Sequence, residues 1–279
     1  MNNKLSKKEN QLMKINVLVL ILVSVWIILA VVFGLHDLDI SKQAVNQNSV
    51  WVKFLENYGM IPGLSIILSG VYVYYSFIKI KSDVWSYVQK VVFFLVSSGV
   101  IFYLFDIILD RIVTNHLIIF LIISFSISII IFSAIHFKNQ VRSAIAIRYA
   151  KVVVGMALFG YVIFIQGVKY FWGRVRFREL DSAFSQFTPW YLPQGFTGFD
   201  SFPSGHAAMG WMLLALLVLL INKKHWVKLS AIVIIFLWGF TLALSRVVIG
   251  AHYASDVLFG SFFIIVTFLL FYNRHTNQT

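Results

Sequence analysis

The sequence predicts an all-α protein that crosses a membrane several times. Of its 279 residues, 59% are hydrophobic and only 12% are charged, and the mean hydropathy is +0.84. Soluble domains carry about 25% charged residues. The 27 phenylalanines and 8 tryptophans suit a helix bundle with many rings facing lipid or lying at its interfaces. An ordinary soluble domain is therefore excluded.

Long apolar runs define the expected helices. A helix needs roughly 20 apolar residues to cross about 30 Å of hydrocarbon. The first run lacks a small-residue cleavage site, so we expect a retained anchor and not a removed signal peptide. Runs of suitable composition predict about eight spans, the shortest being the sixth, near 15–35, 57–79, 88–108, 116–136, 150–168, 206–221, 229–247 and 253–272.

The distribution of basic residues predicts the orientation. With the N-terminus and C-terminus inside, about two thirds of the 23 Lys and Arg residues fall in inside segments, as the positive-inside rule requires. The outside charges concentrate at 169–178 and at Arg246, where we expect a function that needs positive charge. The net charge of +12 is then mainly topological, and no nucleic-acid partner is expected.

The chain is expected to form one integrated membrane domain. It has no cysteine, which excludes disulfides, thiolate metal sites and cysteine nucleophiles. No internal repeat and no proline-rich or serine-rich linker is visible. We expect N-terminal transmembrane helices of unknown role at 1–148 and a catalytic helix core at 149–279, because the polar motifs fall in the second part.

The first polar cluster is KYFWGRVRF, at the outer end of the fifth span. Lys169 and Arg176 stand seven residues apart, close to two helical turns. If the helix continues, both side chains share one face about 10 Å apart and can converge on one anion. Alternatively, these residues reach toward lipid headgroups at a helix end.

The second cluster is SFPSGH, directly before the sixth apolar run. Ser204 is a good helix N-cap, and the amides of Gly205, His206 and Ala207 belong to the helix's first turn. A helix N-terminus with a glycine that permits close approach is a ready anion site. The alternative is an ordinary cap followed by an incidental interfacial histidine.

The third cluster, SRVVIGAHYASD, joins the last two spans. Arg246 ends one helix, Gly250 supports a tight turn, and His252 precedes Asp256 by four residues. Positions i and i+4 share a helix face, so Asp256 is expected to accept a hydrogen bond from one ring nitrogen of His252. The alternative is a pair that only ties down the last helix, although an acid in a span is costly.

The predicted topology places all three clusters on the outer face. Together they hold two histidines, a carboxylate, three cationic side chains and a helix N-terminus, which suits phosphoryl transfer, whose transition state spreads negative charge over three oxygens. A metal site built from His206, His252 and Asp256 is disfavoured, because the three cations would repel a metal ion.

The order Lys-x6-Arg, Pro-Ser-Gly-His and Ser-Arg-x5-His-x3-Asp resembles that of the type 2 phosphatidic acid phosphatase superfamily, in its membrane lipid phosphatase branch. The resemblance covers about 165–260. Phe177 stands where the family usually has proline, so Arg174 or Arg178 could share the role of Arg176. The family usually has six spans, two fewer than predicted here.

The resemblance implies a role for each motif residue. His252 would be the nucleophile that forms a phosphohistidine, Asp256 would hold it, and His206 would protonate the leaving oxygen and then activate water. No metal or other cofactor is implied, since the fixed cations already neutralise charge. The phosphoryl oxygens would be bound by Lys169, Arg176, Ser204, the Gly205 amide and Arg246.

The implied substrate is a membrane lipid phosphate. It would be a monophosphate, such as phosphatidic acid or phosphatidylglycerophosphate, or an undecaprenyl-type diphosphate, hydrolysed at the extracytoplasmic face of the plasma membrane. Two alternatives remain open: a phosphotransferase that passes the phosphoryl group to another lipid, and a non-enzymatic lipid or anion transporter.

Overall fold

The structure is a computed structural model that describes residues 2–77, 84–109, 117–137 and 143–276. Over these ranges it is all-α, with no strand. The helices are α1 (Asn2–Ala44), α2 (Val50–Tyr58), α3 (Ile61–Phe77), α4 (Val84–Leu109), α5 (Leu117–Phe137), α6 (Ala144–Gly155), α7 (Gly167–Trp172), α8 (Gly205–Trp211), α9 (His225–Val248) and α10 (Ala254–Thr276).

The described helices confirm the all-α class, and their lengths and composition fit a chain that crosses a membrane several times, but the predicted number of spans is not confirmed. Six helical segments are long and apolar enough to cross a membrane. Of two other apolar stretches, Gly205–Leu220 is shorter than a standard span, and Ile118–Ser133 is the part of α5 (Leu117–Phe137) whose side chains the structure describes. The count of eight therefore stays a prediction, because its sixth member is a short helix and its fourth, α5, is described only in part.

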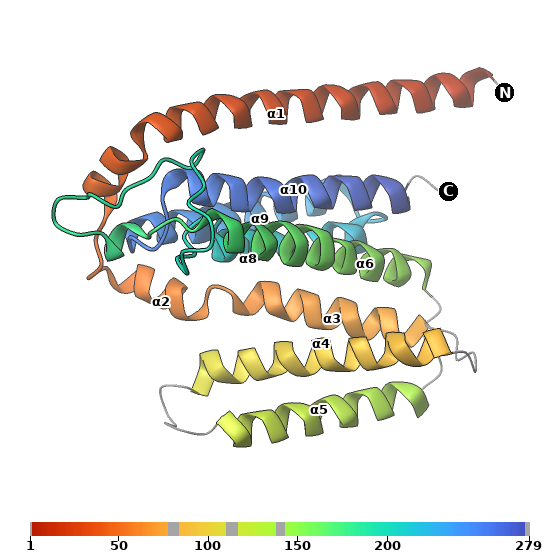
Figure 1. The fold of residues 1–279 in the computed structure, drawn as a ribbon. Coiled ribbons are helices and arrows are strands. Elements are labelled where there is room, and N and C mark those ends of the chain that lie inside the picture. The colour runs from red at the N-terminus through yellow and green to blue at the C-terminus, as the bar shows by residue number, and fades with distance from the viewer. Residues whose placement is uncertain (1, 78–83, 110–116, 138–142, 277–279) are drawn as a thin grey trace.

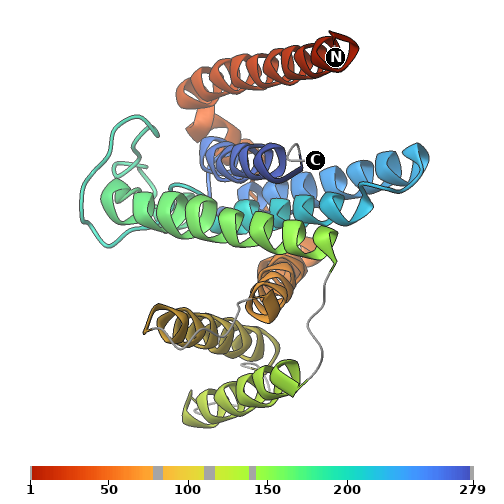
Figure 2. The same ribbon diagram turned by 90° about the vertical axis from the view of Figure 1, so that its right-hand side faces the viewer.

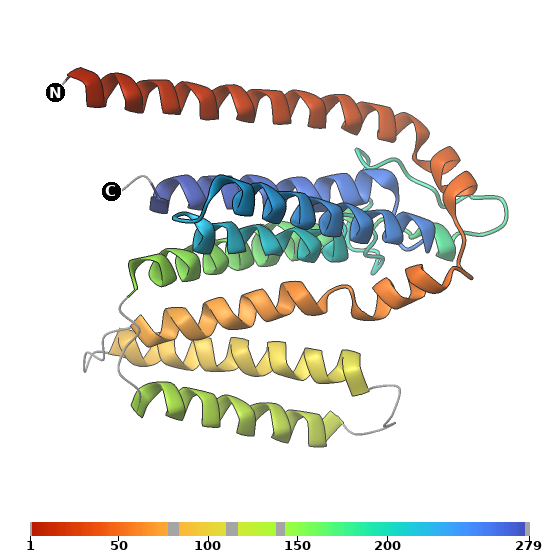
Figure 3. The same cartoon turned by 180° about the vertical axis from the view of Figure 1, so that it is seen from behind.

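Helix α10 lies among α1, α6, α8 and α9. Helix α1 packs on one side of α10, while α8, α9 and α6 pack against its other sides (Figures 1 and 2). Helices α4 and α5 lie beyond α3, away from α10 (Figure 2). Seen from behind, α8 and α9 run along α10 (Figure 3). The division at residue 148 stays a prediction, since helices on its two sides pack together.

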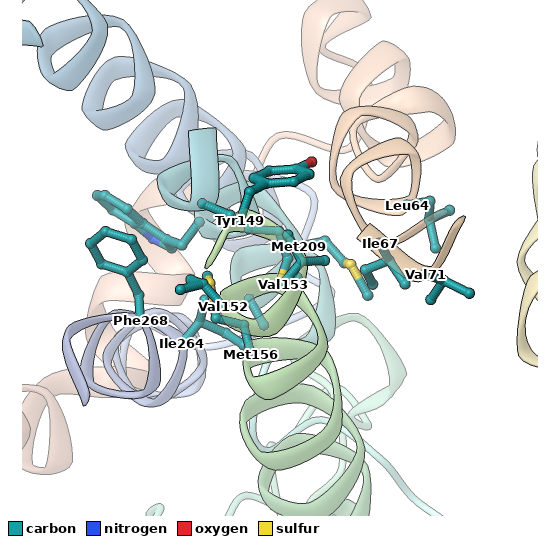
Figure 4. Packing of buried hydrophobic residues seen from close by; sticks show 14 of the residues in the cluster. Leu64, Ile67, Val71, Tyr149, Val152, Val153, Met156, Met209, Ile264 and Phe268 are labelled. Atoms are coloured by element: carbon teal, nitrogen blue, oxygen red, sulfur yellow. The ribbon is translucent and has the colours of Figure 1, made fainter. Parts of the chain in front are cut away.

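The central core forms where α3, α6, α8 and α10 meet. Buried apolar side chains such as Ile67, Val153, Met209 and Ile264 interlock there (Figure 4). On the outer faces, large apolar side chains remain exposed, as on α9 at Phe236. Such faces suit contact with lipid tails, and packing between helices then comes mainly from close van der Waals fit.

The two ends of the bundle differ. Both termini lie at one end, and the loop from 173 to 204 lies at the other (Figure 1). The polar motifs meet at this second end. That the termini are inside stays a prediction. Some basic residues used to predict the orientation lie outside the described residues, namely Lys79, Lys81, Arg111, Lys138 and Arg142.

Candidate active site

The helix that carries Lys169 ends before it reaches Arg176. It runs from α6 through a π-helical segment, Met156–Gln166, into α7, and Gly173 closes it with a left-handed φ of 59°. A residue in this conformation commonly ends a helix, and glycine adopts it without a Cβ penalty. The prediction that Lys169 and Arg176 share one helix face is therefore wrong.

Lys169 and Arg176 nevertheless converge on one anionic group, the carboxylate of Asp200. Lys169 Nζ lies 3.5 Å from Asp200 Oδ2, and Arg176 Nη2 lies 2.6 Å from Oδ1. Burial opposes ionisation of Asp200, but the two cations outweigh it and lower its pKa. The pair can hold a single anion, as the sequence spacing suggested, although through the loop and not through a helix face.

Ser204 begins α8 as predicted. Its Oγ accepts the Ala207 N–H at 3.3 Å, so this amide is already paired within the helix turn. The Ser204 N–H donates to the Asp256 carbonyl at 2.9 Å and ties the second motif to the third. A Cβ on Gly260 would stand 2.3 Å from the Ser204 carbonyl, so only glycine permits this approach.

His206 contacts helix α2, which the sequence analysis did not connect with the site. Its Nε2 lies 3.2 Å from the carbonyl oxygen of Glu56. Because a carbonyl only accepts, Nε2 carries the hydrogen. The Glu56 side chain contacts Arg178 Nη1 at 2.8 Å and Arg246 Nη2 at 3.4 Å. Arg178 is thus paired with Glu56.

His252 is oriented by a backbone carbonyl. Its Nδ1 lies 2.6 Å from Ser201 O and 3.6 Å from Asp256 Oδ2. Nδ1 therefore makes its hydrogen bond with the Ser201 carbonyl, and the predicted direct hydrogen bond with Asp256 is not formed, because Asp256 lies farther from Nδ1. Asp256 instead accepts from Ser201 Oγ at 2.5 Å and from the Tyr253 N–H at 2.9 Å. Gly250 forms the preceding turn with φ +73°, as predicted.

The Ser201 contact determines which ring nitrogen of His252 is available for reaction. A carbonyl cannot donate, so Nδ1 carries the hydrogen and the lone pair lies on Nε2 in the neutral ring. Burial lowers the pKa of His252 to about 4, although Asp256 acts in the opposite direction. At neutral pH the ring is therefore uncharged, which is its nucleophilic form.

We expect His252 to remain neutral well below the pH at which exposed histidines titrate. Because burial penalises the imidazolium, its ¹⁵N shifts should stay those of the Nδ1–H tautomer from pH 8 to about 5. Histidine-labelled protein in detergent, with the signal assigned by His252→Ala, provides the measurement. Imidazolium shifts from His252 within this pH range would contradict the assignment.

Arg174 forms ion pairs with two buried carboxylates. Its side chain is 1% exposed, Nη1 lies 2.6 Å from Asp256 Oδ1, and Nη2 lies 2.9 Å from Asp37 Oδ2. The guanidinium also lies over the Tyr253 ring, 3.9 Å from its centroid. Arg174 is therefore unsuited to share the role of Arg176. Asp37 was missed by the sequence analysis, although an acid at the end of an apolar run is itself a functional signal.

Some cations of the site retain unused donors. Arg246 is 3% exposed, and its buried Nε and Nη1 have no partner within the described part of the chain. The same holds for the buried Nε of Arg176. Leaving a buried donor unpaired costs about 1–3 kcal/mol. An anionic ligand with several oxygens would satisfy such donors.

The three motifs therefore meet at one end of the bundle, and Lys169, Asp256 and Arg246 all act electrostatically on His252. Among the described residues, no three His, Asp or Glu side chains gather as metal ligands do.

Comparison with known proteins shows that the C-terminal part of the chain is similar to a known protein family. Residues 148–279 match the model of the PAP2 superfamily, and this confirms the resemblance drawn from the three motifs. The match begins at residue 148, within α6, so α1 to α5 lie outside it. No solved structure gives a significant match.

The curated relatives are lipid phosphatases. A lipid A 1-phosphatase of Rhizobium etli is 33% identical over 95 residues, which cover 33% of this chain and 37% of the relative. A lipid A 1-phosphatase of Rhizobium johnstonii is 35% identical over 81 residues, covering 28% and 30%. The chain thus spans about a third of the length of the curated relatives it matches.

Proposed function

We propose that the protein is a metal-independent phosphatase of membrane lipid phosphates that acts at the extracytoplasmic face of the plasma membrane. The observation that carries the proposal is the Nδ1 contact of His252 with Ser201, which leaves Nε2 as a nucleophile beside cations with unpaired donors. The superfamily match and the names of the relatives support it.

In the first step, the lone pair on His252 Nε2 attacks phosphorus. A P–N bond forms while the bond from phosphorus to the lipid oxygen breaks. His206, in its imidazolium form, gives its Nδ1 proton to the leaving oxygen, while its Nε2–H stays bonded to the Glu56 carbonyl. The His252 ring becomes positively charged, and its Nδ1–H remains bonded to Ser201 with Asp256 at 3.6 Å. Both groups favour that charge.

In the second step, His206 takes a proton from water as the water oxygen attacks the phosphohistidine. The P–N bond breaks, and inorganic phosphate leaves. Lys169, Arg176 and Arg246 would bind the phosphoryl oxygens in both steps, together with Ser204 and the Gly205 amide. These fixed cations supply the charge neutralisation that a metal ion provides in other phosphatases.

The proposal is tested by phosphate release from purified protein on a panel of lipids. The panel holds phosphatidic acid, phosphatidylglycerophosphate, an undecaprenyl-type diphosphate and, following the relatives' names, lipid A. We expect turnover of at least one lipid that is unaffected by a chelator. Absence of turnover, or a requirement for divalent metal, would refute the proposal. Labelled phosphate appearing in lipid instead of solution would indicate transfer to an acceptor.

The rate loss caused by replacing His206 should depend on the leaving group. A lipid alkoxide needs a proton to leave, whereas a phosphate leaving from a diphosphate is a weaker base and needs it less. His206→Ala should therefore slow phosphohistidine formation from a monophosphate at least about tenfold more than from a diphosphate, measured in single-turnover experiments. Equal losses on the two substrates would contradict the acid role of His206.

A further inference from the structure

Helix α1 lies outside the region that matches the superfamily, yet it contributes a buried carboxylate near the site. Asp37 is 1% exposed. Its Oδ2 contacts Arg174 Nη2 at 2.9 Å, and its Oδ1 accepts the Ser255 N–H at 2.9 Å. The Ser255 hydroxyl also donates to Asp37. Asp37 therefore accepts a hydrogen bond from a backbone N–H in the first turn of α10, the helix that begins shortly after His252.

A continuous series of hydrogen bonds leads from Asp37 to the ring of His252. Arg174, held by Asp37, bonds Asp256 through its side chain and accepts the Ser201 N–H through its backbone carbonyl at 3.0 Å. Asp256 accepts from the Ser201 hydroxyl. The Ser201 carbonyl then accepts from His252 Nδ1. Ser201 is thus fixed on two sides by groups that Arg174 positions.

We propose that Asp37 is a positioning residue of the active centre: it fixes Arg174 and the first turn of α10, and through them the Ser201 carbonyl that sets the tautomer of His252. The inference rests on the proposed function, because it assigns His252 the nucleophile's role. It makes α1 a working part of the active centre and not only a membrane anchor. Asp37 pairs with Arg174 and not with the cations assigned to phosphate.

This placement predicts a specific kinetic pattern. Asp37→Asn removes the charge that holds Arg174 while keeping the size of the side chain. We expect kcat to fall about 10-fold to 100-fold, the range for partners that orient a histidine at metal sites. KM and inhibition by inorganic phosphate should change less than about twofold, because phosphate binding is left intact. Asp37→Glu, which restores the charge, should recover part of kcat.

The matched control is Asp39→Asn, which removes a charge from the exposed face of the same helix. It should leave kcat and KM at their wild-type values. A purely structural role for Asp37 would lower the yield and thermal stability of Asp37→Asn but leave kcat per folded molecule unchanged. That result, or a match between Asp37→Asn and Asp39→Asn, would overturn the inference.

A second readout separates this inference from the proposed function. The ¹⁵N shifts of His252 report its tautomer whether or not a substrate is turned over. We expect only the Nδ1–H form in the wild type and in Asp39→Asn, and a mixture in Asp37→Asn. An inactive wild type with this shift pattern would refute the phosphatase but keep the positioning link. A wild-type tautomer in Asp37→Asn would refute the link.

A milder variant covers the case in which Asp37→Asn does not fold. Ser255→Ala removes the hydroxyl that bonds both Asp37 and Arg174, at 2.9 Å from Arg174 Nη1, without unpairing a charge. It should lower kcat in the same direction by a smaller factor, again with KM unchanged. A wild-type kcat in this variant would count against the series of contacts.

Discussion

Replacing His252 with alanine is expected to abolish hydrolysis, with a loss in kcat of at least about a thousandfold. No other described histidine has a ring nitrogen held by Ser201. The cations assigned to phosphate remain in place, so inorganic phosphate should still bind. Release of labelled phosphate, together with phosphate affinity measured by calorimetry, checks both statements.

The matched control for this experiment is His225→Ala, at the exposed start of α9 and away from the site. It should retain wild-type kcat and KM. Substantial hydrolysis by His252→Ala would remove the nucleophile from the proposal. Movement of a phosphorylated lipid across liposome membranes that survives His252→Ala would favour the transporter alternative.

Replacing Arg174 with methionine is expected to cause a large loss of stability. The side chain lies between the buried carboxylates of Asp37 and Asp256, at 2.9 and 2.6 Å. Methionine has a similar length but no charge, so two carboxylates would remain buried without their cation. Removing one partner of a buried ion pair typically costs about 3–5 kcal/mol. Unfolding in detergent, followed by circular dichroism, measures the change.

Arg178→Met is the comparison for this variant. Arg178 is about a quarter exposed and pairs with Glu56. Such partly exposed ion pairs contribute about 0–1 kcal/mol. The double variant Arg174→Met with Asp37→Asn should regain part of the lost stability, because one unpaired charge is gone. Equal stability of Arg174→Met and Arg178→Met would show that the buried pairs do not stabilise the protein.

The site could be predicted from sequence where its residues are close in the chain. The Ser204 cap and the turn at Gly250 depend on local spacing. In the first motif, the left-handed conformation of Gly173 ends the helix, so the helical spacing of Lys169 and Arg176 did not predict their positions. The contact between His252 and Ser201 was not predicted, because no local pattern indicates which carbonyl a loop presents.

The contributions of the N-terminal helices were also beyond the sequence analysis. Asp37 reaches Ser255 across 218 positions, and Glu56 reaches Arg246 across 190. Neither acid belongs to a motif, and tertiary packing alone brings them to the site. The sixth predicted span was uncertain for another reason: the apolar run at 206–221 indicates composition but not whether its helix is long enough to cross a membrane.

We infer that His252 carries the phosphoryl group during turnover. Rapid acid-free quenching of the protein with a ³²P-labelled lipid phosphate, followed by digestion and mass spectrometry under alkaline conditions, tests it directly. We expect label on His252, formed at least as fast as phosphate is released, and slower loss of label in His206→Ala. Turnover without a labelled histidine, or label on another residue, would contradict it.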